Sequence, residues 1–210
     1  MSIKSKKIIE ALDSLFPNAK IELTHKNTYE LIIAVILSAQ TTDVSVNKVT
    51  PKLFKKYPNI DTLSKANIED VIKIIKSIGL YRTKAKNIIL MANQVKDNFN
   101  GEIPNTRTDL ESLAGVGRKT ANVVLANAFD KDVIAVDTHI HRISIRLGIA
   151  KKTANAREVE ESLYKFFPKE NYLKLHHQLI FFGRYHCLAR NPKCLNCPLY
   201  DICVYENKMA

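Results

Sequence analysis

The residues of this 210-residue chain best suited to binding a metal are its four cysteines, which lie near the C-terminus in the pattern Cys-x6-Cys-x2-Cys-x5-Cys. Thiolates at such short spacing suit a tetrahedral zinc ion or an iron–sulfur cluster. Zinc sites usually use two close cysteine pairs, and only one gap here is short, so the spacing favours a cluster without excluding zinc. Two disulfides are disfavoured because we find no secretory signal. The cysteines are Cys187, Cys194, Cys197 and Cys203.

The histidines lack the spacing of metal ligands. His139 and His141 would point to different sides of a helix, and His176 and His177 are adjacent. We expect these side chains to pack or to form hydrogen bonds.

A second group of chemically informative residues lies in Leu113–Ala121, where Gly115 and Gly117 are followed by Arg118 and Lys119. Two glycines one residue apart let the backbone turn sharply and approach a partner closely. The helix expected to begin at this turn would point its free N–H groups outward, which is an arrangement that binds phosphate. Many helix–helix turns carry glycine for packing alone, but in a basic chain the pattern favours a nucleic-acid contact.

Lys119 could do more than contact a phosphate. The helix N-terminus and the neighbouring Arg118 both disfavour an additional positive charge, which increases the fraction of neutral amine able to attack carbon. Such an amine can form a Schiff base with a sugar aldehyde carbon. Asp137 is its candidate partner, because a carboxylate can cap the following helix and also face a cationic intermediate.

The charge of the chain indicates an anionic partner. Lysine and arginine number 32 against 21 acidic residues, which gives a formal net charge of +11. This excess favours nucleic acid first and an anionic membrane surface second, although a general drift of surface positions to lysine would give the same balance. The longest apolar run, Leu31–Leu37, is too short to span a bilayer, and we expect a cytoplasmic protein that associates with the nucleoid through DNA.

Apolar residues recur at helical spacing along almost the whole chain, so the sequence predicts an all-α fold. Only Val133–Val136 has the composition of a strand, and a single strand does not make a sheet. Pro51 is expected to kink or restart the helix around it. The expected helices include segments near 8–16, 28–37, 67–79, 81–99, 118–129, 138–147, 156–166 and 171–183.

Capping residues are expected at four helix starts, and Asn67, with Asp70 three residues on, is one of them. Asn27 with Glu30 and Thr108 with Glu111 have the spacing of capping boxes. Asp43 is expected to cap the helix that contains Pro51.

The chain contains no low-complexity tract or flexible linker that would divide it, yet the cysteine segment needs helices to bury its apolar side. We therefore expect one domain that is discontinuous in sequence, formed by residues 1–21 and 133–210 and containing the cysteine loop 187–203. The other domain, residues 22–132, would contain the turn at Gly115 and Gly117.

In their order and joint occurrence these motifs resemble endonuclease III, a family of bifunctional DNA glycosylases of base excision repair. The resemblance covers nearly the whole chain. It rests on Leu37–Asp43, Ile78–Tyr81, the helix-hairpin-helix Leu113–Ala121, Val136–His139 and the cysteine loop. It implies two helical domains with a DNA-binding cleft between them and a [4Fe–4S] cluster held by the four cysteines.

By this resemblance the protein is expected to remove oxidised pyrimidines from double-stranded DNA as a monomer and, as an AP lyase, to cut 3′ to the abasic site by β-elimination. Lys119 matches the family's nucleophile and Asp137 its catalytic aspartate. Gln40 matches the residue that fills the gap left by the flipped nucleotide, and Leu80 the wedge into the opposite strand. Further DNA contacts are expected at Gly115, Gly117, Arg118, Thr120, Arg184, Arg190 and Lys193. The last three, in or beside the cysteine loop, could equally serve only to solubilise it.

Ala114 departs from the family pattern, which often has proline before the first glycine. Loss of the proline is expected to loosen the hairpin slightly. Three rival functions remain: an adenine-specific glycosylase relative, a non-catalytic helix-hairpin-helix module and a zinc-stabilised scaffold. Lys119 argues against the adenine-specific relative. The combination of Lys119 with Asp137 argues against the other two, because neither function needs it.

Overall fold

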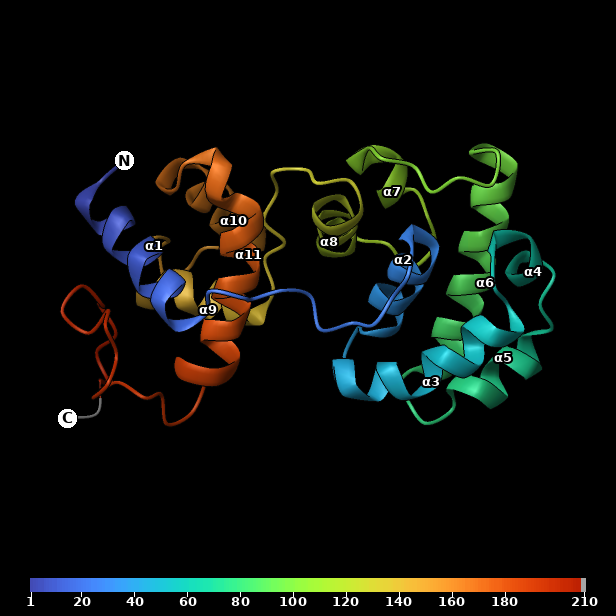
Figure 1. The fold of residues 1–210 in the computed structure, drawn as a ribbon, viewed down its shortest axis with the longest axis horizontal. Helices are drawn as coiled ribbons and strands as arrows, with labels where there is room; N and C mark the ends of the chain where they lie inside the picture. Colours follow the sequence, from blue (N-terminus) through green and yellow to red (C-terminus); the bar gives the residue numbers. More distant parts are fainter. Residues whose placement is uncertain (209–210) are drawn as a thin grey trace. The chain divides into compact units, whose positions relative to one another are not determined.

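The structure, a computed structural model, describes residues 1–208, and its regular secondary structure in that range is entirely helical (Figure 1). The all-α prediction is confirmed. No helix within the described range has both the length and the apolar character needed to cross a membrane. The chain forms two compact units. We call Ile21–Asp130 the hairpin unit, and Met1–Lys20 together with the chain from Lys131 onward the cysteine unit.

The helices of the hairpin unit are α2 (Thr28–Leu37), α3 (Asp43–Lys56), α4 (Ile60–Ser64), α5 (Ile68–Ile75), α6 (Tyr81–Asn98), α7 (Arg107–Glu111) and α8 (Arg118–Ala128). The unit is organised around α2, which is apolar on all sides and buries every residue from Leu31 to Leu37. Helices α3, α6 and α8 pack against α2, and α4 and α5 pack against α6. The helices that begin at the proposed functional residues are therefore fixed to one buried helix.

The cysteine unit contains α1 (Ile3–Leu15), α9 (Thr138–Arg146), α10 (Ala156–Phe166), a short 3₁₀ helix (Lys169–Asn171), α11 (Tyr172–Phe181) and a π-helical turn (Phe182–His186). Helix α11 packs against α1 and α9. Gly183 lets the π-helical turn approach α9, since an added Cβ there would lie 2.7 Å from His139 Cβ. Apolar side chains from α1, α9, α10, α11 and the π-helical turn form one core, including Ile8, Leu12, Ile140, Ile143, Leu163, Leu175, Leu179 and Phe182.

The prediction of a strand at Val133–Val136 is wrong. The Ile134 N–H donates to the Tyr164 hydroxyl at 3.2 Å, and the Ala135 N–H donates to His176 Nδ1 at 3.3 Å. Helix side chains thus satisfy the backbone groups that a strand partner would otherwise bond.

Two of the four predicted caps differ in the structure, a third is only half formed, and Asn67 caps α5 as predicted. Asn27 accepts the Glu30 N–H at 2.9 Å, but the Glu30 carboxylate accepts from the Lys26 N–H instead of closing the box. Thr42 caps α3, and Asp43 is its first residue. Thr106 caps α7, so that helix begins before the predicted Thr108. Hydroxyl and carboxylate residues adjoin each other at these starts, so sequence alone left the choice of cap ambiguous.

Pro51 neither ends nor restarts α3, which continues through it to Lys56. Burial on both sides of the proline, at Val49, Thr50 and Leu53, holds the helix together despite the missing N–H. Helix α5 ends at Ile75, before the predicted boundary at Gly79.

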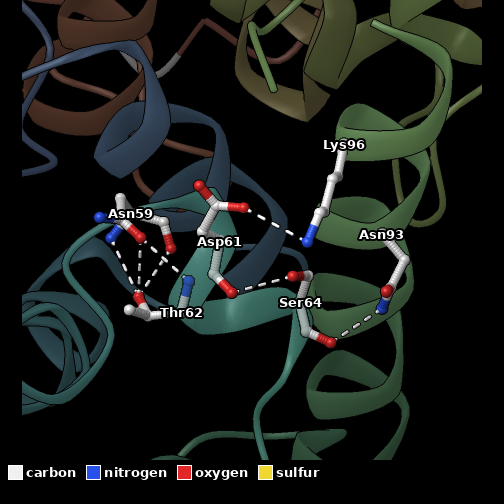
Figure 2. Close-up of polar contacts among 6 residues, drawn as sticks. All are labelled: Asn59, Asp61, Thr62, Ser64, Asn93 and Lys96. Atoms are coloured by element: carbon white, nitrogen blue, oxygen red, sulfur yellow. Dashed lines mark hydrogen bonds and ion pairs between the residues drawn. The ribbon is translucent and has the colours of Figure 1, made fainter. Parts of the chain in front are cut away.

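Helix α4 was not expected from the sequence. Asn59 and Thr62 form a capping box at its start, as Figure 2 shows. Asp61 pairs with Lys96 of α6 at 3.4 Å, and the Ser64 carbonyl accepts from the Asn93 amide at 3.2 Å. Exposed ion pairs contribute at most about 1 kcal/mol, so the buried Ile60 and Leu63 provide most of the attachment.

Candidate functional site

The predicted turn at the two glycines joins α7 to α8. Gly115 has φ of +79°, the left-handed region that favours glycine, and Gly117 is the N-cap of α8. The N-cap Gly117 has no side chain and makes no side-chain cap bond, so the start of α8 leaves room for an anion. The side chains of Leu113 and Val116 are buried and attach the turn to the rest of the hairpin unit. The hairpin therefore has the geometry of a phosphate-binding site.

Gln94 of α6 fixes the entry to this hairpin and was missed from the sequence. Its side-chain amide donates to the Ser112 carbonyl at 3.2 Å and accepts from the Ala114 N–H at 2.7 Å. A proline at position 114 has no N–H and could not make the second bond. The bond to Gln94 thus offsets the loosening expected from the loss of proline.

Lys119 is exposed in the first turn of α8. Arg118 and Thr120 flank it and are both half-buried. The amine therefore projects from the uncapped end of the helix, where an anionic ligand would bind.

Asp137 belongs to the cysteine unit and caps α9. Its Oδ1 accepts the N–H groups of His139 and Ile140 at 2.9 and 2.8 Å. The same side chain is half-buried, and no hydrogen bond to Oδ2 is found within residues 1–208. Asp137 is therefore a cap with one carboxylate oxygen left for another role.

The histidines form hydrogen bonds or pack. His141 Nε2 lies 2.8 Å from the Ala154 carbonyl, and His139 Nδ1 lies 3.3 Å from an Arg142 guanidinium nitrogen. Burial lowers the pKa of His177 to about 4, so this ring is neutral at pH 7.

Gln40 and Leu80 occupy two exposed turns of the hairpin unit. Both have left-handed backbone, with φ of +53° and +56°. Leu80 is 56% exposed although it is apolar, and it immediately precedes α6. A non-glycine residue in this conformation costs about 1–2 kcal/mol, and such strain is most often kept where function requires it. Both side chains are presented to solvent, as the roles expected for them require.

The four cysteines are half-buried free thiols that line one pocket. Arg146 of α9 also lines it and was not anticipated from the sequence. Its guanidinium donates to Cys187 Sγ at 3.3 Å and to the Leu188 carbonyl at 2.7 Å, and it lies 4.0 Å above the Tyr205 ring. Arg142, one turn earlier, donates to the Cys187 carbonyl at 2.9 Å. Two arginines of one helix thus hold the start of the cysteine loop.

The donor set fits an iron–sulfur cluster. No three histidine, cysteine or acidic side chains of residues 1–208 are grouped as ligands of a single metal ion. His186 Nε2, in the wall of the same pocket, is buried without a hydrogen-bond partner in the described range and could donate to a cluster sulfur. Burial raises the pKa of the Cys187 thiol, and the Arg146 guanidinium opposes this by favouring the thiolate.

The basic residues expected to contact DNA from the cysteine loop differ in exposure. Arg190 and Lys193 are exposed within the loop, whereas Arg184 is half-buried in the π-helical turn that precedes it. The first two are the better placed to meet a phosphate.

Comparison with known protein families identifies the class of protein. Residues 33–169 match the HhH-GPD superfamily of base excision DNA repair proteins. Residues 187–203, which hold the four cysteines, match the iron–sulfur binding domain of endonuclease III. The predicted iron–sulfur cofactor is thereby confirmed.

Individual relatives narrow this class to one family. Endonuclease III of Bacillus subtilis (strain 168) is 48% identical over 195 residues, covering 93% of this chain and 89% of the relative. Endonuclease III of Escherichia coli (strain K12) is 46% identical over 206 residues, covering 98% and 97%. The structure of a trapped endonuclease III–DNA covalent intermediate superimposes with a TM-score of 0.91 at 48% identity, covering 97% of each chain. The chain belongs to the endonuclease III family, as its motifs predicted.

Replacing each hairpin glycine with alanine should show that Gly115 is needed to form the turn and Gly117 is needed for a phosphate to approach the backbone. At Gly115 a Cβ would lie 3.1 Å from the Asn87 side chain with φ of +79°, so Gly115→Ala is expected to lower the free energy of unfolding by about 1–2 kcal/mol. At Gly117 a Cβ meets no atom within 4 Å, so Gly117→Ala should fold normally but weaken binding to duplex DNA. Urea denaturation and fluorescence anisotropy measure the two effects. Undiminished DNA binding by Gly117→Ala would argue against a phosphate site.

Two substitutions at Leu80 should show that its strain is retained for function. Leu80→Gly relieves the left-handed strain and Leu80→Ala does not, so the glycine variant should be the more stable by about 0.5–1 kcal/mol. Both remove the exposed side chain and should slow excision of a damaged base from duplex DNA. Denaturation midpoints and single-turnover kinetics test this. Equal stability of the two variants would show that the turn is unstrained.

Proposed function

We propose that this chain removes oxidised pyrimidines from double-stranded DNA and then cleaves the strand at the resulting abasic site, with Lys119 as the nucleophile. As a member of the endonuclease III family it is a base excision repair enzyme, a DNA glycosylase with AP lyase activity. The observation that carries the assignment of Lys119 is its exposed position at the uncapped N-terminus of α8.

The hairpin would hold the DNA while the damaged nucleotide leaves the stack. Backbone N–H groups at Gly117 and the start of α8 bind a phosphate, and Arg118 and Thr120 flank this position. Extruding a nucleotide costs a few kcal/mol, and less for a lesion that already stacks badly. Gln40 fills the vacated space, and Leu80 enters the opposite strand.

Lys119 then acts on the sugar. Its amine attacks C1′, and the bond from C1′ to the damaged base breaks as the base departs. Ring opening gives a Schiff base between Nζ and C1′. Loss of a C2′ proton then expels the 3′ phosphate, which nicks the strand, and water releases Lys119.

Asp137 assists this chemistry from the start of α9. Its carboxylate can stabilise the positive charge that develops on the sugar or take up a proton from the attacking amine. The hydrogen bonds from His139 and Ile140 engage only Oδ1, which leaves Oδ2 for this role.

The four cysteines would hold the iron–sulfur cluster in the loop that bears Arg190 and Lys193. These two exposed side chains are proposed to bind DNA phosphates beside the lesion. We further propose that the enzyme acts as a monomer in the cytoplasm on chromosomal DNA, and that the hairpin and cysteine units are its two domains.

Borohydride reduction tests the nucleophile. Wild-type protein with a duplex containing thymine glycol or an abasic site should give a covalent complex, and Lys119→Arg should give none while still binding the duplex. Arginine keeps the charge for a phosphate contact but cannot form the Schiff base. If wild type binds well and traps nothing, the protein is a non-catalytic DNA-binding module. If excision is confined to adenine, the adenine-specific alternative holds.

Asp137→Asn tests the second residue. Asparagine caps helices as well as aspartate does, so the free energy of unfolding should change little. Removal of the charge should slow base excision by about 10²-fold or more, in single-turnover measurements. If a stably folded Asp137→Asn variant excises the base at the wild-type rate, Asp137 serves only as a helix cap.

A further inference from the structure

Lys84 is a buried cation that the proposed chemistry does not use. It lies in the first turn of α6 and is only 3% exposed. Its ammonium donates to the Thr41 hydroxyl at 2.7 Å, and burial lowers the pKa of the Lys84 amine below the ordinary value. A buried lysine bonded to a neutral hydroxyl is unfavourable by itself, so the arrangement is expected to serve another purpose.

The bond from Lys84 reaches the turn that presents Gln40. The Thr41 hydroxyl, which accepts from Lys84, donates to the Ala39 carbonyl at 3.4 Å. Ala39 and Thr41 are the two neighbours of Gln40. The chain of hydrogen bonds from Lys84 therefore connects the residues on either side of the exposed left-handed position.

The same lysine is bonded to the turn that presents Leu80. Its backbone N–H donates to the Leu80 carbonyl at 3.0 Å. The two turns also lie against each other, since a Cβ on Gly79 would lie 3.7 Å from the Gln40 carbonyl oxygen and 3.8 Å from Thr41 Oγ1. Lys84 thus contacts both turns at the place where they meet.

We propose that Lys84 is a positioning residue that holds the two turns in one register, so that Gln40 and Leu80 enter the duplex together. The inference rests on the DNA-inserting roles proposed for those two residues. Exposed left-handed turns persist only where the surrounding structure determines them. Lys84 is bonded to one turn through its buried side chain and to the other through its backbone N–H, so it can fix both without touching DNA.

The test compares opening of the duplex with chemistry on an already exposed sugar. Lys84→Met and Thr41→Val should each slow single-turnover excision of thymine glycol from a duplex by about tenfold, since small misplacements of positioning groups have large effects on rate. The fluorescence increase of 2-aminopurine placed beside the lesion, which reports unstacking, should slow to the same extent. Borohydride trapping on a single-stranded abasic oligonucleotide needs no insertion into a duplex and should stay within about twofold of wild type.

Three further variants complete the experiment. Thr41→Ser keeps the hydroxyl and should excise at the wild-type rate. The double variant of Lys84→Met and Thr41→Val should be no slower than the slower single variant, because both remove the same bond. Lys96→Met is the matched control: it makes the same change in the same helix at a lysine that pairs with the exposed Asp61, and it should match wild type in every assay.

Each outcome decides the inference. Wild-type excision by both Lys84→Met and Thr41→Val overturns it and leaves the proposed function standing. Equal losses in duplex excision and single-strand trapping also overturn it, because they indicate general damage to the fold. Lack of trapping by wild type would instead contradict the proposed function. If Lys84→Met fails to fold, the comparison of Thr41→Val with Thr41→Ser decides alone.

Discussion

The burial of α2 is the constraint on which the hairpin unit depends. Seven successive residues of α2 are buried, and full burial of an aliphatic side chain contributes about 1.5–3 kcal/mol. The helix leads directly into the turn of Gln40, and it packs against α6, which follows Leu80, and α8, which contains Lys119. Ile36 also approaches the hairpin, with its Cγ2 3.2 Å from where a Cβ on Gly115 would lie. One buried helix thus fixes the positions of three exposed functional segments.

The cysteine unit has a different constraint, which is to hold an irregular loop that lies outside any helix. Arg142 and Arg146 do this from α9, one turn apart, by donating to backbone carbonyls of the loop. Cys187, Cys197 and Cys203 also pack against the apolar core of the unit, so that the loop is attached by packing as well as by hydrogen bonds. Because Asp137 caps the same helix, one element carries both the loop supports and the proposed catalytic carboxylate.

Much of the fold was predictable, because long helices have strong periodicity and clear ends. The predicted segments at 118–129, 138–147 and 156–166 agree with α8, α9 and α10 to within a residue or two. The errors were local. The caps at Thr42 and Thr106 compete with neighbouring residues of similar chemistry, and α4 is too short for its apolar residues to show a period. Pro51 does not restart its helix, because packing on both sides outweighs one missing hydrogen bond.

The sequence by itself determined the family and the candidate reactive residues, because these depend on residue types at fixed spacing. The iron–sulfur cofactor followed from the resemblance to the family, since the cysteine spacing alone also allows zinc. Only the tertiary structure showed which other side chains hold the candidate functional residues in place. Gln94 at the hairpin entry, Arg146 at the cysteine loop and Lys84 beneath the two turns act through contacts with residues distant in sequence. No local pattern encodes such contacts, since a buried polar side chain is defined by the groups that the fold brings around it.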